Sequence, residues 1–189
     1  MIFKRKKSTD EQEPLEGESE ALKILKANIA GYAGYKNQEF RKETDIAFRK
    51  KLLKILRDCD DNMSKAHELL IQSQRLTSWG VAQMIKKTLK ELRAKVADPD
   101  YKYSTFFEID DVEGENGIDL SIMYLLEIEI LDNAEELKEK VDHVKTSLDE
   151  MMLETLDDEL ANVLSIGKNL ATRYNERLEL IRAFEKMKL

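Results

Sequence analysis

Residues 118–149, "IDLSIMYLLEIEILDNAEELKEKVDHVKTSLD", carry the pattern that decides the fold. Apolar side chains recur here at steps of three and four residues. They are Met123, Leu126, Ile130, Ala134, Leu137, Val141, Val144 and Leu148. On an α-helix this spacing brings the side chains onto one face, so the stretch predicts a long helix with one buried side.

The same period appears in three further stretches. In residues 36–76 it runs through Phe48, Leu52, Ile55, Cys59, Ala66, Leu69 and Leu76. It restarts at Val81 and continues to Val96, and a last stretch extends from Leu153 to Phe184. Leu56, Met63 and Leu70 widen the first stripe, which favours the face of a helical bundle over the thin seam of a two-stranded coiled coil.

The composition supports an all-α protein. The 189 residues include only 7 Gly and 2 Pro, while 42% are hydrophobic and 37% are charged. The single cysteine forms no internal disulfide, which indicates a reducing compartment. No apolar run reaches the roughly 18 residues of a membrane-spanning helix, and no signal peptide is evident. We therefore expect a soluble, cytoplasmic protein.

The chain divides into a tail and one helical domain. Residues 1–18 are polar and contain Pro14 and Gly17, so we predict a disordered N-terminal tail. Residues 19–189 form the predicted bundle domain, which begins with a short helix over 20–33 capped by Ser19. "GYAGY" (31–35) then predicts a break before the first long helix.

Two architectures fit these helices. In the first, the chain turns near "TSWG" (77–80) and near residue 150, which gives an antiparallel bundle of about four long helices. In the second, 36–97 and 118–188 form one long antiparallel hairpin that would bury its wide stripes by dimerising. We favour the bundle because it covers those stripes within one chain. A capping-box pattern at Ser147 and a cap at Thr155 are both candidate starts for the last helix.

The charges are divided between two halves of the chain. Residues 35–97 hold 15 Lys or Arg against 8 Asp or Glu, a net charge of +7. Residues 106–163 hold 3 against 19, a net charge of −16. The simplest interpretation is that the two halves pair within one molecule, with Lys86, Lys90 and Arg93 beside acids of the second half. The alternative is that one half faces a partner of opposite charge.

The residues that carry most enzyme chemistry are scarce. His67 and His143 both lack the Glu-x-x-His spacing of a carboxylate-bridged metal site. Cys59 lies in an apolar stripe between two aspartates, which predicts an inert thiol. No glycine-rich phosphate loop is present in the sequence. Glu127 and Glu129 interrupt an apolar run, and they point about 200° apart on a helix, so at least one of them could be partly buried. We favour flank positions for both, in salt bridges with the basic helix. We predict no catalytic residue, metal or cofactor.

Two features are candidates for contact with a partner. The connector 98–117 contains Tyr101, Tyr103, Phe106 and Phe107, which either plug the open end of the bundle or bind a partner. The cations Lys86, Lys90 and Arg93 share one helix face and would suit an acidic protein surface. Nucleic acid is disfavoured, because the sequence pI is about 5.1 and no recognition motif is present.

The first seven residues, "MIFKRKK", suggest an alternative. Met1, Ile2 and Phe3 could enter a bilayer surface while Lys4, Arg5, Lys6 and Lys7 meet anionic lipid. Six acids follow within residues 8–20 and weaken that attraction. We therefore predict a non-enzymatic helical scaffold or protein-interaction module that binds a protein partner or itself. The alternative is an assembly protein held peripherally at the inner membrane surface.

Overall fold

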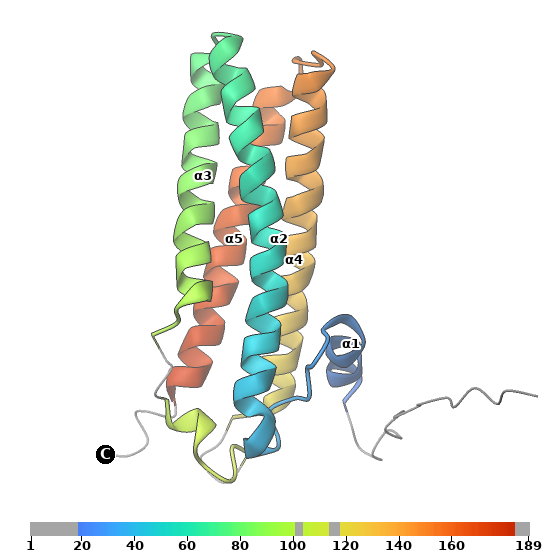
Figure 1. The fold of residues 1–189 in the computed structure, drawn as a ribbon, viewed down its shortest axis with the longest axis vertical. Coiled ribbons are helices and arrows are strands. Elements are labelled where there is room, and N and C mark those ends of the chain that lie inside the picture. Colours follow the sequence, from blue (N-terminus) through green and yellow to red (C-terminus); the bar gives the residue numbers. More distant parts are fainter. Residues whose placement is uncertain (1–18, 101–103, 114–117, 184–189) are drawn as a thin grey trace, which may run out of the picture.

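The computed structural model describes residues 19–100, 104–113 and 118–183, and four long helices in it lie side by side (Figure 1). These helices are α2 (Gln38–Gln72), α3 (Leu76–Ala97), α4 (Leu120–Asp149) and α5 (Leu156–Arg182). The short helix α1 (Glu20–Asn28) packs beside α4, and one 3₁₀ turn, η1 (Thr105–Phe107), lies in the connector. The prediction of an all-α bundle is confirmed, and the alternative of one long hairpin is wrong.

The first reversal lies between α2 and α3, slightly earlier than predicted. Gln74 adopts a left-handed backbone conformation with φ of 57°, which turns the chain without a glycine. The predicted break at 77–80 is incorrect, because "TSWG" forms the first turn of α3. The hydroxyl of Ser78 does not cap this helix and instead donates to Asp157 Oδ1 of α5 at 2.5 Å.

The second reversal follows α4, close to the predicted position at residue 150. Met151 takes a left-handed φ of 60° there. The capping-box interpretation of Ser147 is wrong, because Ser147 lies within α4 and its hydroxyl donates to Glu159 Oε2 at 3.0 Å across the turn. Thr155 does occupy the N-cap position of α5, although its hydroxyl contacts the Glu159 side chain at 2.6 Å and caps no backbone N–H.

The segment after α1 contains the predicted break, and α1 ends at Asn28 instead of residue 33. Gly31 and Gly34 both have positive φ, of 81° and 94°. A Cβ on Gly34 would lie 3.0 Å from the Leu22 side chain and 3.1 Å from Tyr124 Oη. Glycine therefore allows the chain to pass closely between α1 and α4 before α2 begins.

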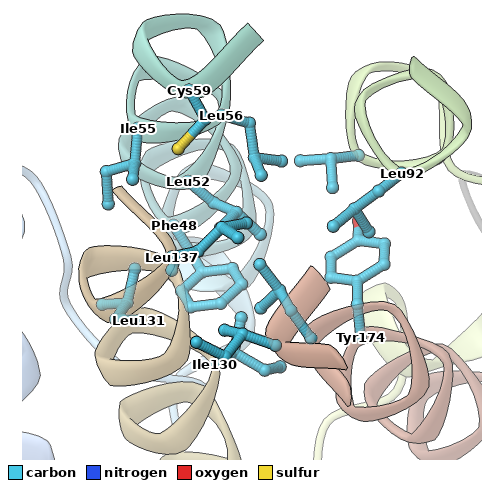
Figure 2. Packing of buried hydrophobic residues seen from close by; sticks show 14 of the residues in the cluster. Phe48, Leu52, Ile55, Leu56, Cys59, Leu92, Ile130, Leu131, Leu137 and Tyr174 are labelled. Carbon is cyan, nitrogen blue, oxygen red and sulfur yellow. The ribbon is translucent and has the colours of Figure 1, made fainter. Parts of the chain in front are cut away.

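The four long helices occupy the corners of the bundle. Each of α2 and α5 packs against both α3 and α4, so α3 and α4 lie at diagonally opposite corners. The core between them is mostly apolar, and Figure 2 shows side chains from all four helices meeting in it. Cys59 is buried among these residues, and burial raises the pKa of its thiol to about 12. The thiol is therefore protonated at neutral pH, as predicted for an inert core cysteine.

The connector closes one end of the bundle through its phenylalanines. Phe106 and Phe107 are buried, and the Phe106 ring lies 5.5 Å from the ring of Tyr35. The connector is also held by the buried guanidinium of Arg41, which donates to the backbone carbonyls of Tyr35, Lys36, Phe106, Ile109 and Asp110. This single side chain therefore fixes the start of α2 and the connector together.

Replacing Arg41 with lysine tests this role. One ammonium has three donors and lacks the planar fork, so buried carbonyls would lose their partner. We expect Arg41→Lys to lower the free energy of unfolding by about 1–3 kcal/mol in denaturant titrations. The neighbouring Lys42→Ala serves as a control and should change it by less than about 0.5 kcal/mol. Equal effects of the two substitutions would contradict the assignment.

Candidate functional site

A cluster of buried polar side chains surrounds Arg177 of α5 near the closed end of the bundle. Arg177 Nε donates to Glu127 Oε1 of α4 at 2.7 Å, and Nη2 donates to Asp45 Oδ1 of α2 at 2.8 Å. Nη2 also contacts Tyr35 Oη at 2.8 Å. The guanidinium carbon lies 4.6 Å from the centre of the Phe48 ring. Arg177 thus bonds to residues of α2, α4 and the segment between α1 and α2.

Glu127 is the second centre of this cluster. It accepts hydrogen bonds from the hydroxyls of Tyr32 and Tyr35, the latter at 2.6 Å. Burial raises the pKa of both tyrosines, so both stay protonated and donate. Burial also raises the pKa of Glu127, whereas Arg177 and the two hydroxyls act in the opposite direction. We call Arg177, Glu127, Asp45, Tyr32 and Tyr35 the Arg177 cluster.

The position of Glu127 corrects the sequence-based expectation. Glu127 is fully buried and bonds to α5, instead of lying at a flank in a salt bridge with the basic helix. Glu129 does lie at the surface, where it pairs with Arg173 of α5 at 3.0 Å. The charged groups of Arg177 and Glu127 are buried, and neighbouring side chains supply their hydrogen bonds. The Arg177 cluster therefore stabilises the fold and offers no open face to a substrate.

Removing one partner of this buried pair should be costly. Arg177→Met leaves the buried Glu127 carboxylate without its cation and should lower the free energy of unfolding by about 3–5 kcal/mol. Glu127→Leu should lower it by less, because Arg177 keeps its ion pair with Asp45. The double variant leaves fewer unpaired charges, so its loss should be clearly smaller than the sum of the two. Denaturant unfolding of all four proteins in one cycle measures this coupling. Additive losses would show that the two residues do not act as a pair.

The tyrosines of the cluster predict a loss of stability at alkaline pH. Their pKa is raised in the folded state, so their contribution is complete below the unfolded value of about 10 and declines as pH rises above it. We expect the free energy of unfolding of Tyr32→Phe to fall less steeply than that of the natural chain between about pH 9 and 11. Parallel curves would contradict a buried, protonated Tyr32.

A groove between α2 and α3, with a volume of about 1010 Å³, is open on the described surface. Its lining residues recur at steps of three and four along both helices. They are Leu53, Arg57, Asp60, Ser64 and His67 from α2, and Gln83, Met84, Lys86, Lys87, Lys90, Arg93, Ala94 and Ala97 from α3. The groove is thus lined by both apolar side chains and five cations, and we call it the basic groove.

The cations of the basic groove are not neutralised as the sequence suggested. Arg93 pairs with Asp60, which belongs to the basic half of the chain. Neither Lys86 nor Lys90 has an ion pair with a carboxylate of the described residues. The expectation that these cations pair with the acidic half is therefore wrong. The physical reason is that α3 packs on α2 and α5, while the most acidic helix, α4, lies at the opposite corner.

His67 lines one end of the basic groove and packs against Trp79 of α3. The rings of His67 and Trp79 lie 5.5 Å apart. His67 Nε2 and Trp79 Nε1 are buried and have no hydrogen-bond partner among the described residues. Burial and the nearby charge of Lys86 lower the pKa of His67, so this histidine is neutral at pH 7. The positive charge of the groove comes from its lysines and arginines.

The other residues that the sequence predicted to contact a partner or a membrane lie in three different places. Met1–Lys7, Tyr101 and Tyr103 lie outside the described residues, as does the whole tail 1–18. Phe106 and Phe107 are buried, which fits the plug interpretation and leaves neither ring free for a partner. Lys86, Lys90 and Arg93 are brought together on one wall of the basic groove, with Arg57 opposite.

Sequence reasoning missed the Arg177 cluster and the pairing of His67 with Trp79. For Arg177 a weak signal exists, because the apolar spacing of α5 runs through Leu170, Tyr174 and Ile181 and places Arg177 between the last two on the buried face. The pairing of His67 with Trp79 has no comparable signal, since it depends on where the chain turns between α2 and α3.

The described residues contain no group of three His, Cys, Asp or Glu side chains arranged to hold a metal ion. None of the described helices is both long enough and apolar enough to cross a membrane. His143 is exposed and contacts Glu159 Oε2 at 3.2 Å. The basic groove is open on the described surface and is lined by five cations.

Comparison with known proteins finds no matching family model, no similar curated protein and no similar solved structure.

Proposed function

We propose that the protein is a non-enzymatic helical interaction module whose basic groove binds an acidic helical segment of a protein. The observation that carries this proposal is the position of Lys86 and Lys90. They project from α3 into an open groove, one turn apart, and neither has a carboxylate partner among the described residues. Two unneutralised cations at this spacing complement acids placed four residues apart on another helix.

The shape and lining of the groove support a helix as its occupant. The groove lies along two neighbouring helices, and a third helix can pack into the space between two others. Leu53, Met84 and Ala94 supply apolar contact between the charged residues. Phosphate backbones would use the cations but not this apolar surface, and Asp60 would repel them. These points favour a protein segment over nucleic acid.

A peptide titration tests the proposed function. The probe is a synthetic helical peptide with Glu residues at i and i+4 and Leu on the adjoining positions, followed by fluorescence anisotropy. We expect binding that salt weakens, and about tenfold lower affinity for the variant Lys86→Gln/Lys90→Gln, because two exposed ion pairs contribute about 0.5–1 kcal/mol each. A scrambled peptide with its acids out of register should bind more weakly.

The matched control changes two lysines outside the groove. Lys140→Gln/Lys145→Gln removes the same charge from α4 and should leave peptide affinity unchanged. Equal loss in both double variants would show that only net charge matters, and absence of binding to the natural chain would refute the proposal. Tighter binding of a short DNA duplex than of the peptide would favour nucleic acid as the occupant.

A further inference from the structure

The fold places opposite charges on opposite edges of the bundle. Helix α3 carries five Lys or Arg and one Glu, whereas α4 carries three Lys and eight Asp or Glu. Because α3 and α4 occupy diagonal corners, their exposed faces point away from each other (Figure 1). One molecule therefore has a basic edge and an acidic edge that cannot neutralise each other directly.

The heights of these two edges along the bundle can be compared through α5. Lys95 contacts Asn175 at 3.1 Å, which sets the level of α3 against α5. Arg173 contacts Glu129 at 3.0 Å, and Asn169 contacts Asn133 at 3.5 Å, which set the level of α4. Together these contacts place Lys86 and Lys90 of α3 at about the heights of Glu136 and Asp132 of α4.

The two edges also match in spacing and accessibility. Lys86 and Lys90 are four residues apart, and so are Asp132 and Glu136, so each pair spans one turn. Asp132 and Glu136 are exposed and have no ion pair with a described residue. The same contacts place exposed Ala97 of α3 at about the height of Leu125 of α4, which is 60% exposed.

We propose that the occupant of the basic groove is the acidic α4 edge of a second copy of this chain. The inference rests on the proposed function and names its partner. A copy displaced sideways, without rotation or shift along the bundle axis, would set Asp132 and Glu136 beside Lys90 and Lys86 and bring Leu125 toward Ala97. The α4 helix would run antiparallel to the α3 helix that it meets.

The arrangement of charges selects the symmetry of this contact. A two-fold contact between two α3 edges would face cations with cations, and one between two α4 edges would face acids with acids. Attraction therefore requires a head-to-tail contact between unlike edges. Such a contact leaves one basic and one acidic edge free, so further copies add and form an open chain, because a contact without rotation closes no ring.

Sedimentation velocity of the full chain tests this inference. We expect species larger than a monomer at about 50 mM salt and mainly monomer at about 500 mM salt, because the contact depends on exposed charges. A monomer at both salt concentrations, up to about 1 mM protein, would overturn the proposal, since that concentration exceeds the Kd of even a weak specific contact.

Neutralising one edge at a time gives a sharper result. Lys86→Gln/Lys90→Gln and Asp132→Asn/Glu136→Asn should each be monomeric alone, whereas an equimolar mixture should form a one-to-one dimer and nothing larger. Each copy in that mixture supplies the edge that the other lacks. Lys140→Gln/Lys145→Gln should assemble at least as readily as the natural chain, because it removes two cations from the acidic edge. Assembly that survives in either single-edge variant, or no dimer in the mixture, would overturn the proposal.

The two proposals can fail separately. If the synthetic acidic peptide binds the basic groove and the natural chain stays monomeric, the partner is another protein and the further inference is wrong while the proposed function stands. If the chain assembles but neither edge variant changes the assembly, the contact lies elsewhere. Loss of peptide binding together with loss of assembly in Lys86→Gln/Lys90→Gln is the result that supports both.

Discussion

The buried guanidinium of Arg177 is the interaction on which the arrangement of this bundle depends. It bonds to Glu127 of α4 and Asp45 of α2, and through Tyr35 it reaches the segment that follows α1. A charge removed from water is tolerated only where its partners are placed to satisfy it. Apolar stripes alone permit sliding and rotation of helices, whereas this set of directional bonds specifies how α2, α4 and α5 stand relative to one another.

This constraint has a consequence at the surface. With α2 and α5 each contacting both remaining helices, α3 and α4 are held at opposite corners. The cations of α3 then line an open groove and the acids of α4 face away from it. Charges that would partly neutralise each other if α3 lay beside α4 instead give the molecule two unlike edges. The proposed binding of an acidic helix, and of a second copy, both follow from that separation.

The sequence predicted the features that periodicity controls. The stripes through Leu126 and Leu52 indicated long helices correctly, because a buried face must repeat with the period of the helix. The first turn was misplaced because Gln74, and not a glycine, takes the left-handed conformation. The Arg177–Glu127 pair was missed because the two residues lie 50 positions apart. The predicted pairing of Lys86, Lys90 and Arg93 with the acidic half was wrong, because the total charge of a segment does not specify which faces meet.

Disulfide trapping tests the separation of the two edges most directly. In a Cys59→Ala background, one chain carries both Ala97→Cys and Leu125→Cys, at equal heights on opposite edges of the bundle, and is oxidised mildly at about 50 mM salt. We expect disulfides between different copies, giving a ladder of covalent oligomers that join position 97 to position 125. A monomer with an internal 97–125 disulfide would contradict this expectation, because α3 and α4 would then be adjacent within one molecule.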